Sequence, residues 1–309
     1  MSKYSHTLLC LSGPTAVGKS DIAMEIARRL GSDIISADSM QIYRGMDIGT
    51  AKPTKLDQGI IKHHMIDIIN CDEEYSSYMY KEAVDGIIAQ HEESQQPSLI
   101  VGGTAFYLDS LLYKLDFEVN GQTIELRDRL LHEYTERGAQ YLHDKLHNLD
   151  PQSAERIHPN NVKRVIRAIE VASMGGSLSN ARDKCSRYNH VLFALSMNRP
   201  LLYERINNRV DTMVKQGLIE EVQNVYADYH DRRLQALQGI GYKEIIQYLE
   251  GEITLSDSVD LIKRHSRNYA KRQLTFLKRL NPIWLDVTST QSNVIDTILD
   301  EYYMKSSYV

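Results

Sequence analysis

The fold is decided by the stretch Leu8-Leu9-Cys10-Leu11-Ser12-Gly13-Pro14-Thr15-Ala16-Val17-Gly18-Lys19-Ser20. A short apolar run leads into the pattern Gly-x-x-x-x-Gly-Lys-Ser, and an amphipathic stretch over 21–30 follows. This is the order of strand, glycine loop and helix that a phosphate-binding loop requires. Because glycine has no Cβ, the loop backbone can wrap an oxyanion, and N–H groups at the helix start point at it. The stretch predicts a site for a diphosphate-like group and leaves open whether that group is ATP.

Each residue type in the loop has a physical role in that site. The residues expected to surround the anion are Gly13, Pro14, Thr15, Ala16, Val17, Gly18, Lys19 and Ser20. Lys19 adds a full positive charge, and the hydroxyl of Ser20 is a ligand for Mg²⁺. The alternative is a surface glycine turn, which the flanking strand and helix signals disfavour.

Composition places the chain among ordinary globular proteins. It has 309 residues, 42% hydrophobic and 25% charged, enough for one large domain with an insertion or for two domains. No apolar run approaches the roughly 20 residues of a membrane span, so no membrane partner is expected. The three cysteines lack metal-ligand spacing, which suggests a cytoplasmic protein with reduced thiols. The net charge of -5 restricts any nucleic-acid surface to a local patch.

The apolar runs predict an α/β fold. Beyond the first strand, strands are expected at 33–37, 63–69, 98–101, 190–197 and 282–286. Helical patterns alternate with them in the first third, which predicts a phosphate-loop NTPase-like core: a parallel sheet covered by helices. Residues 123–149 are helical and polar, without strand signals, and predict a mainly helical insertion. We expect 1–118, 158–210 and 265–309 to form the core with a catalytic channel, and 119–157 and 211–264 to form the helical insertion that clamps RNA.

Asp38 is the first candidate for chemistry. It follows the second predicted strand, at the sheet edge where open α/β sheets bind ligands. A carboxylate there can accept a proton or orient Mg²⁺ through water. The alternative is a helix N-cap. Next to it, Ser39 and Gln41 could bond the edge of an acceptor or simply finish a turn.

The strand over 98–101 ends in Gly102-Gly103, without the acidic residue that phosphate-loop NTPases place there to hold Mg²⁺. Asp38 is the nearest substitute. The two glycines would let a large group approach the backbone. Thr104 could offer its hydroxyl to that group or cap the next helix.

Basic residues form two clusters. Lys163, Arg164 and Arg167 make the first. The second runs along one long helical pattern and comprises Lys263, Arg264, Arg267, Lys271, Arg272, Lys278 and Arg279. Such runs can follow a phosphate backbone, although a solvated helix face with acidic partners elsewhere is the equal alternative. The pair His63-His64 has no third metal ligand nearby in sequence, so a structural role is favoured.

Taken together, the motifs resemble those of the tRNA dimethylallyltransferases, also called tRNA isopentenyltransferases or IPP transferases, in their bacterial form. The resemblance rests on the phosphate loop, on Asp38-Ser-Met-Gln-Ile-Tyr-Arg-Gly-Met-Asp-Ile-Gly-Thr-Ala-Lys-Pro53, on His63-His-Met-Ile-Asp67, on Val101-Gly-Gly-Thr-Ala-Phe-Tyr107, on Arg156-Ile-His-Pro-Asn160, on Arg164-Val-Ile-Arg-Ala-Ile-Glu-Val171, on Gln238-Gly-Ile-Gly-Tyr-Lys-Glu244 and on Tyr269-Ala-Lys-Arg-Gln-Leu-Thr275. These motifs span nearly the whole chain, and the Asp38–Pro53 block is the most specific of them.

The resemblance implies an activity. A dimethylallyl group would pass from dimethylallyl diphosphate to N6 of adenosine 37, next to the anticodon of tRNAs that read codons starting with U, giving N6-dimethylallyladenosine. The partner would be the tRNA anticodon stem-loop, the cofactor Mg²⁺, and the protein a monomer. The alternatives are an ATP-dependent small-molecule kinase and a nucleotide-gated RNA-binding protein.

The resemblance also implies roles for the residues. Asp38 would be the general base, Lys19 and Arg209 would hold the diphosphate, and Thr104 would bond near the amine or the leaving group. On the tRNA side it implies Ser39, Met40 and Gln41, together with Arg127, Lys163, Arg164, Val165, Ile166 and Arg167. From charge alone we add the helical run containing Lys271 and Arg272.

Overall fold

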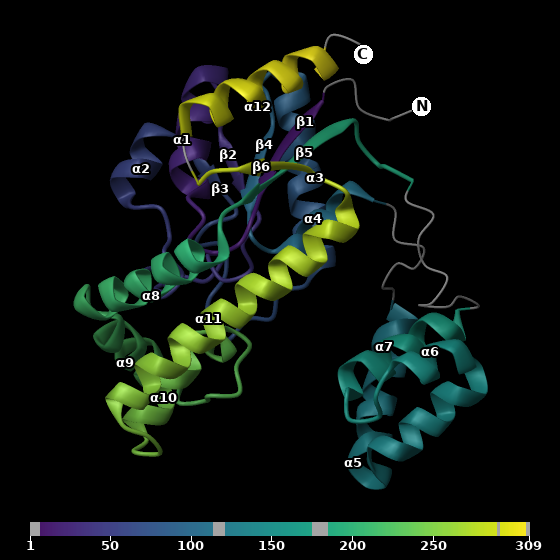
Figure 1. Cartoon of the computed structure of the whole chain (residues 1–309). Helices are drawn as coiled ribbons and strands as arrows, with labels where there is room; N and C mark the ends of the chain where they lie inside the picture. The colour runs from purple at the N-terminus through teal and green to yellow at the C-terminus, as the bar shows by residue number, and fades with distance from the viewer. Residues whose placement is uncertain (1–6, 114–120, 175–184, 289–290, 307–309) are drawn as a thin grey trace. The chain divides into compact units, whose positions relative to one another are not determined.

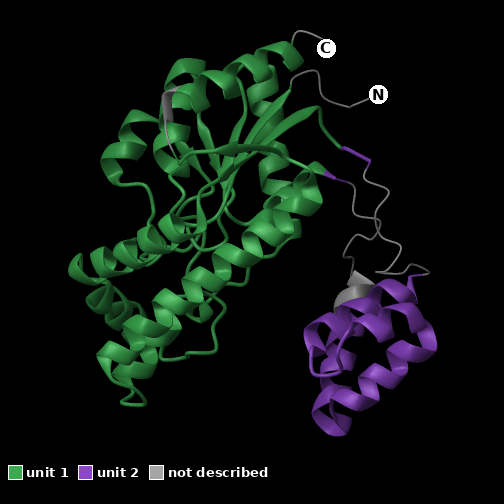
Figure 2. Cartoon of the chain, viewed as in Figure 1, with its two compact units in different colours: residues 1–112, 187–309 green, residues 113–186 purple. Residues whose placement is uncertain are grey.

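The computed structural model describes residues 7–113, 121–174, 185–288 and 291–306. These form two compact units, one of residues 1–112 with 187–309 and one of residues 113–186 (Figure 2). The larger unit contains the phosphate loop, and the smaller unit contains the first of the two segments predicted to form the insertion, that over 119–157.

The larger unit is built on a six-stranded sheet. Its strands are β1 Leu8–Ser12, β2 Ile34–Ser36, β3 His63–His64, β4 Leu99–Gly102, β5 His190–Ser196 and β6 Ile283–Asp286. The order is β3-β2-β4-β1-β5-β6, and every pairing is parallel. The predicted α/β fold with a parallel sheet is therefore confirmed. The strand expected at 63–69 keeps only two residues, because Met65 and Asp67 adopt positive φ and turn the chain away.

Helices cover both faces of this sheet (Figure 1). The helices of the larger unit are α1 Lys19–Leu30, α2 Lys55–Ile60, α3 Ser77–Glu93, α4 Ala105–Leu112, α8 Arg199–Lys215, α9 Leu218–Tyr229, α10 Tyr242–Leu249, α11 Leu255–Leu277 and α12 Gln291–Ser306, with short 3-10 helices at Ala236–Gln238 and Lys278–Leu280. Of these, α9 and α10 lie away from the sheet, against α8 and α11 (Figure 1). Among the described residues, none of the helices combines the length and the apolarity needed to cross a bilayer.

Strand alternation assigns the two faces of the sheet. Leu9 and Leu11 of β1 share one buried cluster with Ile22 and Ile26 of α1 and with Ile298 of α12. The intervening residues of the strand point to the opposite face, where α3 and α4 are joined by the stacked rings of Tyr80 and Tyr107, 4.0 Å between centroids. The sheet is thus buried on both faces, as a parallel sheet requires.

The smaller unit is mainly helical within its described residues, with one isolated bridge between Tyr113 and Ser186. It contains α5 Gly121–Leu149, α6 Pro151–Arg156 and α7 Val162–Ser173. Helix α5 is sharply kinked at Gly138, whose backbone is not helical and has φ 82°. The buried side chains form one core: Leu130, Leu142, Leu146, Ala154, Ile157, Val165, Ile166, Ala168 and Ile169.

This division differs from the expected one. We placed 158–210 in the core, but α7 packs on α5 and buries its apolar stripe there, so 158–186 belong to the smaller unit. The segment 211–264 lies in the larger unit instead of forming a separate body with 119–157. The expected boundary at 118/119 lies outside the described residues. Whether the two segments act together on RNA stays a prediction.

Gly102 offers a test of how tightly the sheet edge is packed. A Cβ added there would lie 2.1 Å from the carbonyl oxygen of Ala37, which is backbone and cannot move freely. We expect Gly102→Ala to lower the free energy of unfolding by about 1–3 kcal/mol, as overpacking does. Gly86 is the matched control, because it is exposed inside α3 with no atom within 4 Å of an added Cβ. Gly86→Ala should stabilise by roughly 0.5–1 kcal/mol. Urea unfolding measures both, and equal stabilities for the two variants would contradict the packing.

Candidate active site

A cavity of about 390 Å³ opens where the carboxyl ends of β1, β2 and β4 meet. Its lining comes from the phosphate loop, from the segment after β2, from α8 and from α11. The lining residues are Thr15, Ala16, Gly18, Lys19, Ser20, Asp21, Asp38, Gln41, Thr50, Ala51, Gly103, Arg205, Asn208, Arg209, Tyr269 and Gln273. The phosphate-loop cation and the predicted base therefore face one cavity.

The phosphate loop has the backbone that its glycines predicted. Gly18 precedes α1 with φ 101°, a left-handed conformation that glycine adopts without strain. Gly13 lies so close to β5 that an added Cβ would come within 2.9 Å of the carbonyl oxygen of Leu195. The ammonium of Lys19 folds back over the loop and donates to the carbonyl oxygens of Gly13, at 2.9 Å, and Pro14, at 2.8 Å.

Two cations, Lys19 and Arg209, face the cavity. Burial and then the nearby charge of Arg209 together lower the pKa of Lys19 to about 8, while Asp38 opposes the shift. Burial also lowers the pKa of Arg209, while Asp38 raises it. A buried pair of like charges is costly unless an anion lies between them. The arrangement therefore favours a multiply charged anion in the cavity.

Asp38 lines the cavity, and Thr104 bonds the residue that follows it. The Met40 N–H donates to Asp38 Oδ1 at 2.9 Å, so the carboxylate closes a turn instead of capping a helix. Thr104 accepts from the Ser39 N–H at 3.0 Å and does not cap α4 through this hydroxyl. Since β4 ends in Gly102-Gly103, Asp38 from the neighbouring strand supplies the carboxylate at this edge.

The glycine pair after β4 admits the protein's own chain. The backbone of Ala37 lies against Gly102, and an added Cβ on Gly103 would be 2.3 Å from the Gln273 amide nitrogen. We expected these glycines to admit a large bound group. The chain just after β2 and Gln273 of α11 lie against them, and Gly103 also lines the cavity, so the approach of a bound group stays a prediction.

Sequence reasoning missed the inward face of α11. Gln273 accepts from the Thr15 N–H at 2.9 Å and donates to the Gly103 carbonyl at 2.9 Å, joining the phosphate loop to the end of β4. One turn earlier, Tyr269 bonds Thr104, and burial beside Asp38 raises the pKa of its hydroxyl to about 12. Arg205 and Asn208 on α8 were missed as well. The signal was the spacing of Tyr269 and Gln273 on one helix face, which the lysines and arginines around them obscured.

The basic run of α11 is divided between internal pairs and exposed charge. Lys263 pairs with Asp211 at 2.6 Å, and Arg267 donates to Asn207 at 2.6 Å. Lys271 and Arg272 are exposed. The run is thus partly the ion-paired helix face that was the alternative. Exposed cations of the kind expected to meet RNA remain at Arg264 and in its C-terminal half.

The residues of the smaller unit that we expected to contact RNA are likewise of three kinds: buried, paired with an internal carboxylate, or exposed. Val165 and Ile166 are buried in its core, which corrects their assignment as RNA-contacting side chains. Arg127 and Arg167 both bond the fully buried Glu170 carboxylate, Arg127 Nε at 2.7 Å and Arg167 Nη1 at 3.0 Å. Arg127 and Arg167 therefore have a structural role, because they neutralise a buried carboxylate. The remaining two, Lys163 and Arg164, are exposed in the first turn of α7.

The histidine pair is separated by the fold. His63 lines a second cavity beside Lys19 and Asp38. His64 Nε2 bonds Asp33 at 2.9 Å, and His91 Nε2 lies 3.9 Å from the same carboxylate. We expected no third ligand near the pair, but these three groups lie within 4.8 Å of one another. The hydrogen bond between His64 and Asp33 is of the structural kind that was favoured for this histidine.

Comparison with known proteins decides the family. The protein-family model described as "IPP transferase" matches residues 41–280 of this chain. The chain belongs to the IPP transferase family. Among curated members, the tRNA dimethylallyltransferase of Alkaliphilus oremlandii is 45% identical, with 96% of each chain covered. That of Bacillus subtilis is 42% identical, with 93% of each chain covered.

Solved structures of the family have the same fold. The full-length tRNA isopentenylpyrophosphate transferase of Bacillus halodurans matches with TM-score 0.73 and 38% identity, over 98% of this chain and 99% of that one. A eukaryotic dimethylallyltransferase, solved acting on tRNA, matches with TM-score 0.79 at 24% identity, over 92% of this chain and 75% of that one. The latter likeness concerns the fold alone.

The lowered pKa of Lys19 predicts how anion binding depends on pH. Burial lowers the pKa of Lys19 from its ordinary 10.5 to about 8, so the free protein loses this charge at about pH 8. An anion favours the charged ammonium, so binding above pH 8 should take up protons, and affinity for inorganic diphosphate should fall as pH rises towards 9. Calorimetry in two buffers of different ionisation enthalpy measures the uptake. Lys19→Met should abolish the part due to the lysine. Equal proton uptake in that variant would contradict the assignment.

Proposed function

We propose that this protein transfers a dimethylallyl group from dimethylallyl diphosphate to N6 of adenosine 37 in tRNAs that read codons starting with U. The product is N6-dimethylallyladenosine. The observation that carries the proposal is the shared cavity, which both the cationic phosphate loop and the Asp38 carboxylate line. Membership of the family, whose curated members are named tRNA dimethylallyltransferases, supports it.

The phosphate loop would stabilise the leaving group. As the bond between the allylic carbon and the diphosphate oxygen breaks, negative charge grows on the diphosphate. Lys19, Arg209 and the loop N–H groups lie where that charge would develop, and such preorganised donors favour the transition state over the ground state. In this proposal, the pKa values of Lys19 and Arg209 are lowered because the site buries both cations at the place where an anion would bind.

Asp38 would be the general base. The N6 amine of adenine is a weak nucleophile because its lone pair is delocalised into the ring. As the N–C bond forms, one N6 proton passes to the Asp38 carboxylate, and diphosphate leaves with the bonding electrons. The Met40 N–H fixes the orientation of this carboxylate. Thr104, held by Ser39 and Tyr269, would bond near the amine.

The residues at the loop suit Mg²⁺. Ser20 lines the cavity in the first turn of α1 with an exposed side chain, next to Asp21, so hard oxygen ligands face the expected position of the diphosphate. When bound there, Mg²⁺ would neutralise charge on the diphosphate. The protein's own residues orient both substrates and accept the proton.

Recognition of tRNA would use the exposed cations. A stacked base cannot reach a closed cavity, so the adenosine would be flipped out of the anticodon loop. Gln41 lines the cavity, and Ser39 and Met40 line a second cavity that Asp38 also lines. Lys163, Arg164, Lys271 and Arg272 would contact the phosphates of the stem-loop. We further propose a monomer that acts in the cytoplasm.

Asp38→Asn tests the assignment of the base. We expect kcat for prenyl transfer to fall by about 10²–10⁴ because the amide cannot accept the N6 proton, while tRNA affinity changes little. The control is Asp72→Asn, an exposed aspartate absent from the cavity lining. Steady-state transfer to tRNA and filter binding provide the two readouts. An unchanged kcat in Asp38→Asn would remove this residue from the mechanism.

Charge reversal tests the RNA surface. The double variant Lys163→Glu with Arg164→Glu should weaken tRNA binding and reduce the slope of log affinity against log salt by roughly one to two. The matched control reverses Lys62 and Lys305, two exposed lysines of the larger unit outside both basic clusters. Equal salt slopes in the two double variants would show that the start of α7 does not meet the RNA.

A further inference from the structure

One segment of the cavity wall is held in place by side chains that do not belong to the sheet. Thr50 and Ala51 line the cavity beside Asp38 and Gln41. The Gln41 side-chain amide donates to the Thr50 and Ala51 carbonyls at 3.3 and 3.4 Å. We define residues 46–52 as the wall loop. Its position decides the shape of the cavity on the side of the proposed base.

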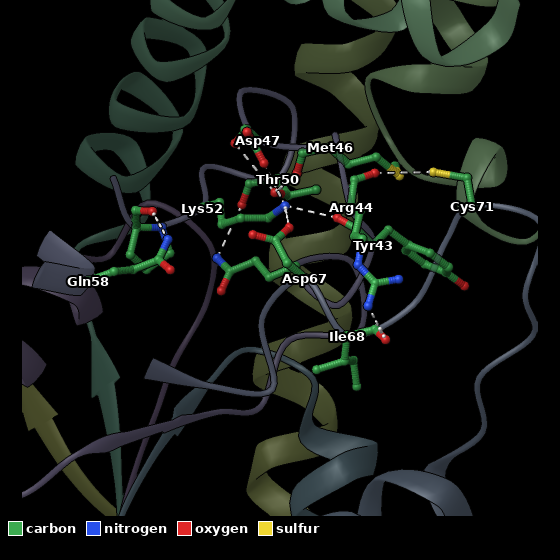
Figure 3. Close-up of polar contacts among 12 residues, drawn as sticks. Tyr43, Arg44, Met46, Asp47, Thr50, Lys52, Gln58, Asp67, Ile68 and Cys71 are labelled. Carbon is green, nitrogen blue, oxygen red and sulfur yellow. Dashed lines mark hydrogen bonds and ion pairs between the residues drawn. The ribbon is translucent and has the colours of Figure 1, made fainter. Parts of the chain in front are cut away.

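Lys52 anchors the wall loop to the sheet side. Its ammonium, with only 2% of the side chain exposed, bonds Asp47 and Asp67 at 2.6 Å each and the Tyr43 carbonyl at 2.9 Å (Figure 3). Two carboxylates and a carbonyl satisfy its three donors, so the charge is buried with full compensation. This end of the wall loop is therefore fixed independently of the helices beyond it.

Glu221 of α9 anchors the other end. Its Oε2 accepts the N–H groups of Asp47 and Ile48 at 2.8 and 2.7 Å, and its Oε1 accepts that of Gly49 at 2.9 Å. Three consecutive backbone donors thus converge on one carboxylate, in the kind of concave arrangement that binds anions. Charge-assisted bonds of this type are stronger than neutral ones.

Tyr242 extends the anchor to α10. Its hydroxyl donates to Glu221 Oε1 at 2.6 Å, and burial, followed by the Glu221 charge, raises the pKa of this hydroxyl, which keeps it a donor. Its ring lies so close to Gly49 that an added Cβ would be 2.6 Å away. The wall loop is therefore joined to both α9 and α10 through Glu221 and Tyr242.

Resting on the proposed function, we propose that Glu221 is a positioning residue for the acceptor. It holds the wall loop against the flipped adenosine and couples that loop to α9 and α10, part of the segment we expect to clamp tRNA. It lies outside the cavity lining and takes no part in donor binding, which belongs to the phosphate loop.

Glu221→Gln tests this role because a side-chain amide has a single acceptor oxygen and would turn its NH₂ towards N–H donors. We expect kcat for transfer to tRNA to fall by about 10- to 100-fold, as misplacement of a reacting group does. The affinity for dimethylallyl diphosphate should stay within about twofold of wild type, because Lys19 and the phosphate loop are unchanged.

Glu250→Gln is the matched control. Glu250 also accepts a tyrosine hydroxyl, that of Tyr226 at 2.6 Å, and it ends α10 without contacting the wall loop. Its variant should have wild-type kcat. Equal kcat values in the two variants would overturn the proposal, and so would a loss of donor affinity in Glu221→Gln that matches the loss of turnover.

Hydrogen exchange separates this inference from the proposed function. The amides of residues 47–49 should exchange faster in Glu221→Gln and unchanged in Glu250→Gln, whatever reaction the protein catalyses. If wild-type protein transfers no prenyl group, the proposed function fails, and the anchoring is then judged by exchange alone. Unchanged exchange at 47–49 in Glu221→Gln would overturn the anchoring itself.

Discussion

The side-chain amide of Gln273 is the interaction on which the site depends. Its oxygen accepts from the phosphate loop at Thr15 and its nitrogen donates to Gly103 at the end of β4. Both partners are main-chain groups of the sheet edge, so the amide fixes α11 to the two strands that bound the cavity. Because this bridge is buried, water does not compete for it. Tyr269, one turn earlier on the same helix, is thereby placed over Asp38 and Thr104.

A parallel sheet makes this convergence possible. The strands β1, β2 and β4 all end at one edge, and they deliver to it the phosphate loop, Asp38 and Gly102-Gly103. The absence of Cβ atoms on the two glycines brings β2 and α11 into contact with β4. The result is a cavity lined by both cations and a carboxylate, the two kinds of charge that an anionic leaving group and an amine losing a proton require. Helices α9 and α10 then brace the wall loop from outside through Glu221.

Local patterns predicted the sheet and the phosphate loop because both depend on short-range constraints. The glycine spacing predicted the loop around Lys19, and the apolar runs predicted where the strands lie. The pattern of α7 did not reveal which core it joins, since its apolar stripe suits any helical neighbour. That stripe nevertheless includes Val165 and Ile166, and the helical periodicity could have identified them as core residues. Contacts such as Gln273 with Thr15 join residues 258 positions apart, and a single sequence carries no direct signal for them.

The most direct test is one transfer assay with the purified protein, Mg²⁺ and unmodified tRNA whose anticodon ends in A. One reaction contains radiolabelled dimethylallyl diphosphate and a parallel one contains radiolabelled ATP. The account predicts that label passes from the prenyl donor to tRNA, and that changing the target adenosine to guanosine abolishes the transfer because the N6 amine is lost. If no prenyl group is transferred and phosphate leaves ATP instead, the cavity holds a nucleotide and the account is contradicted.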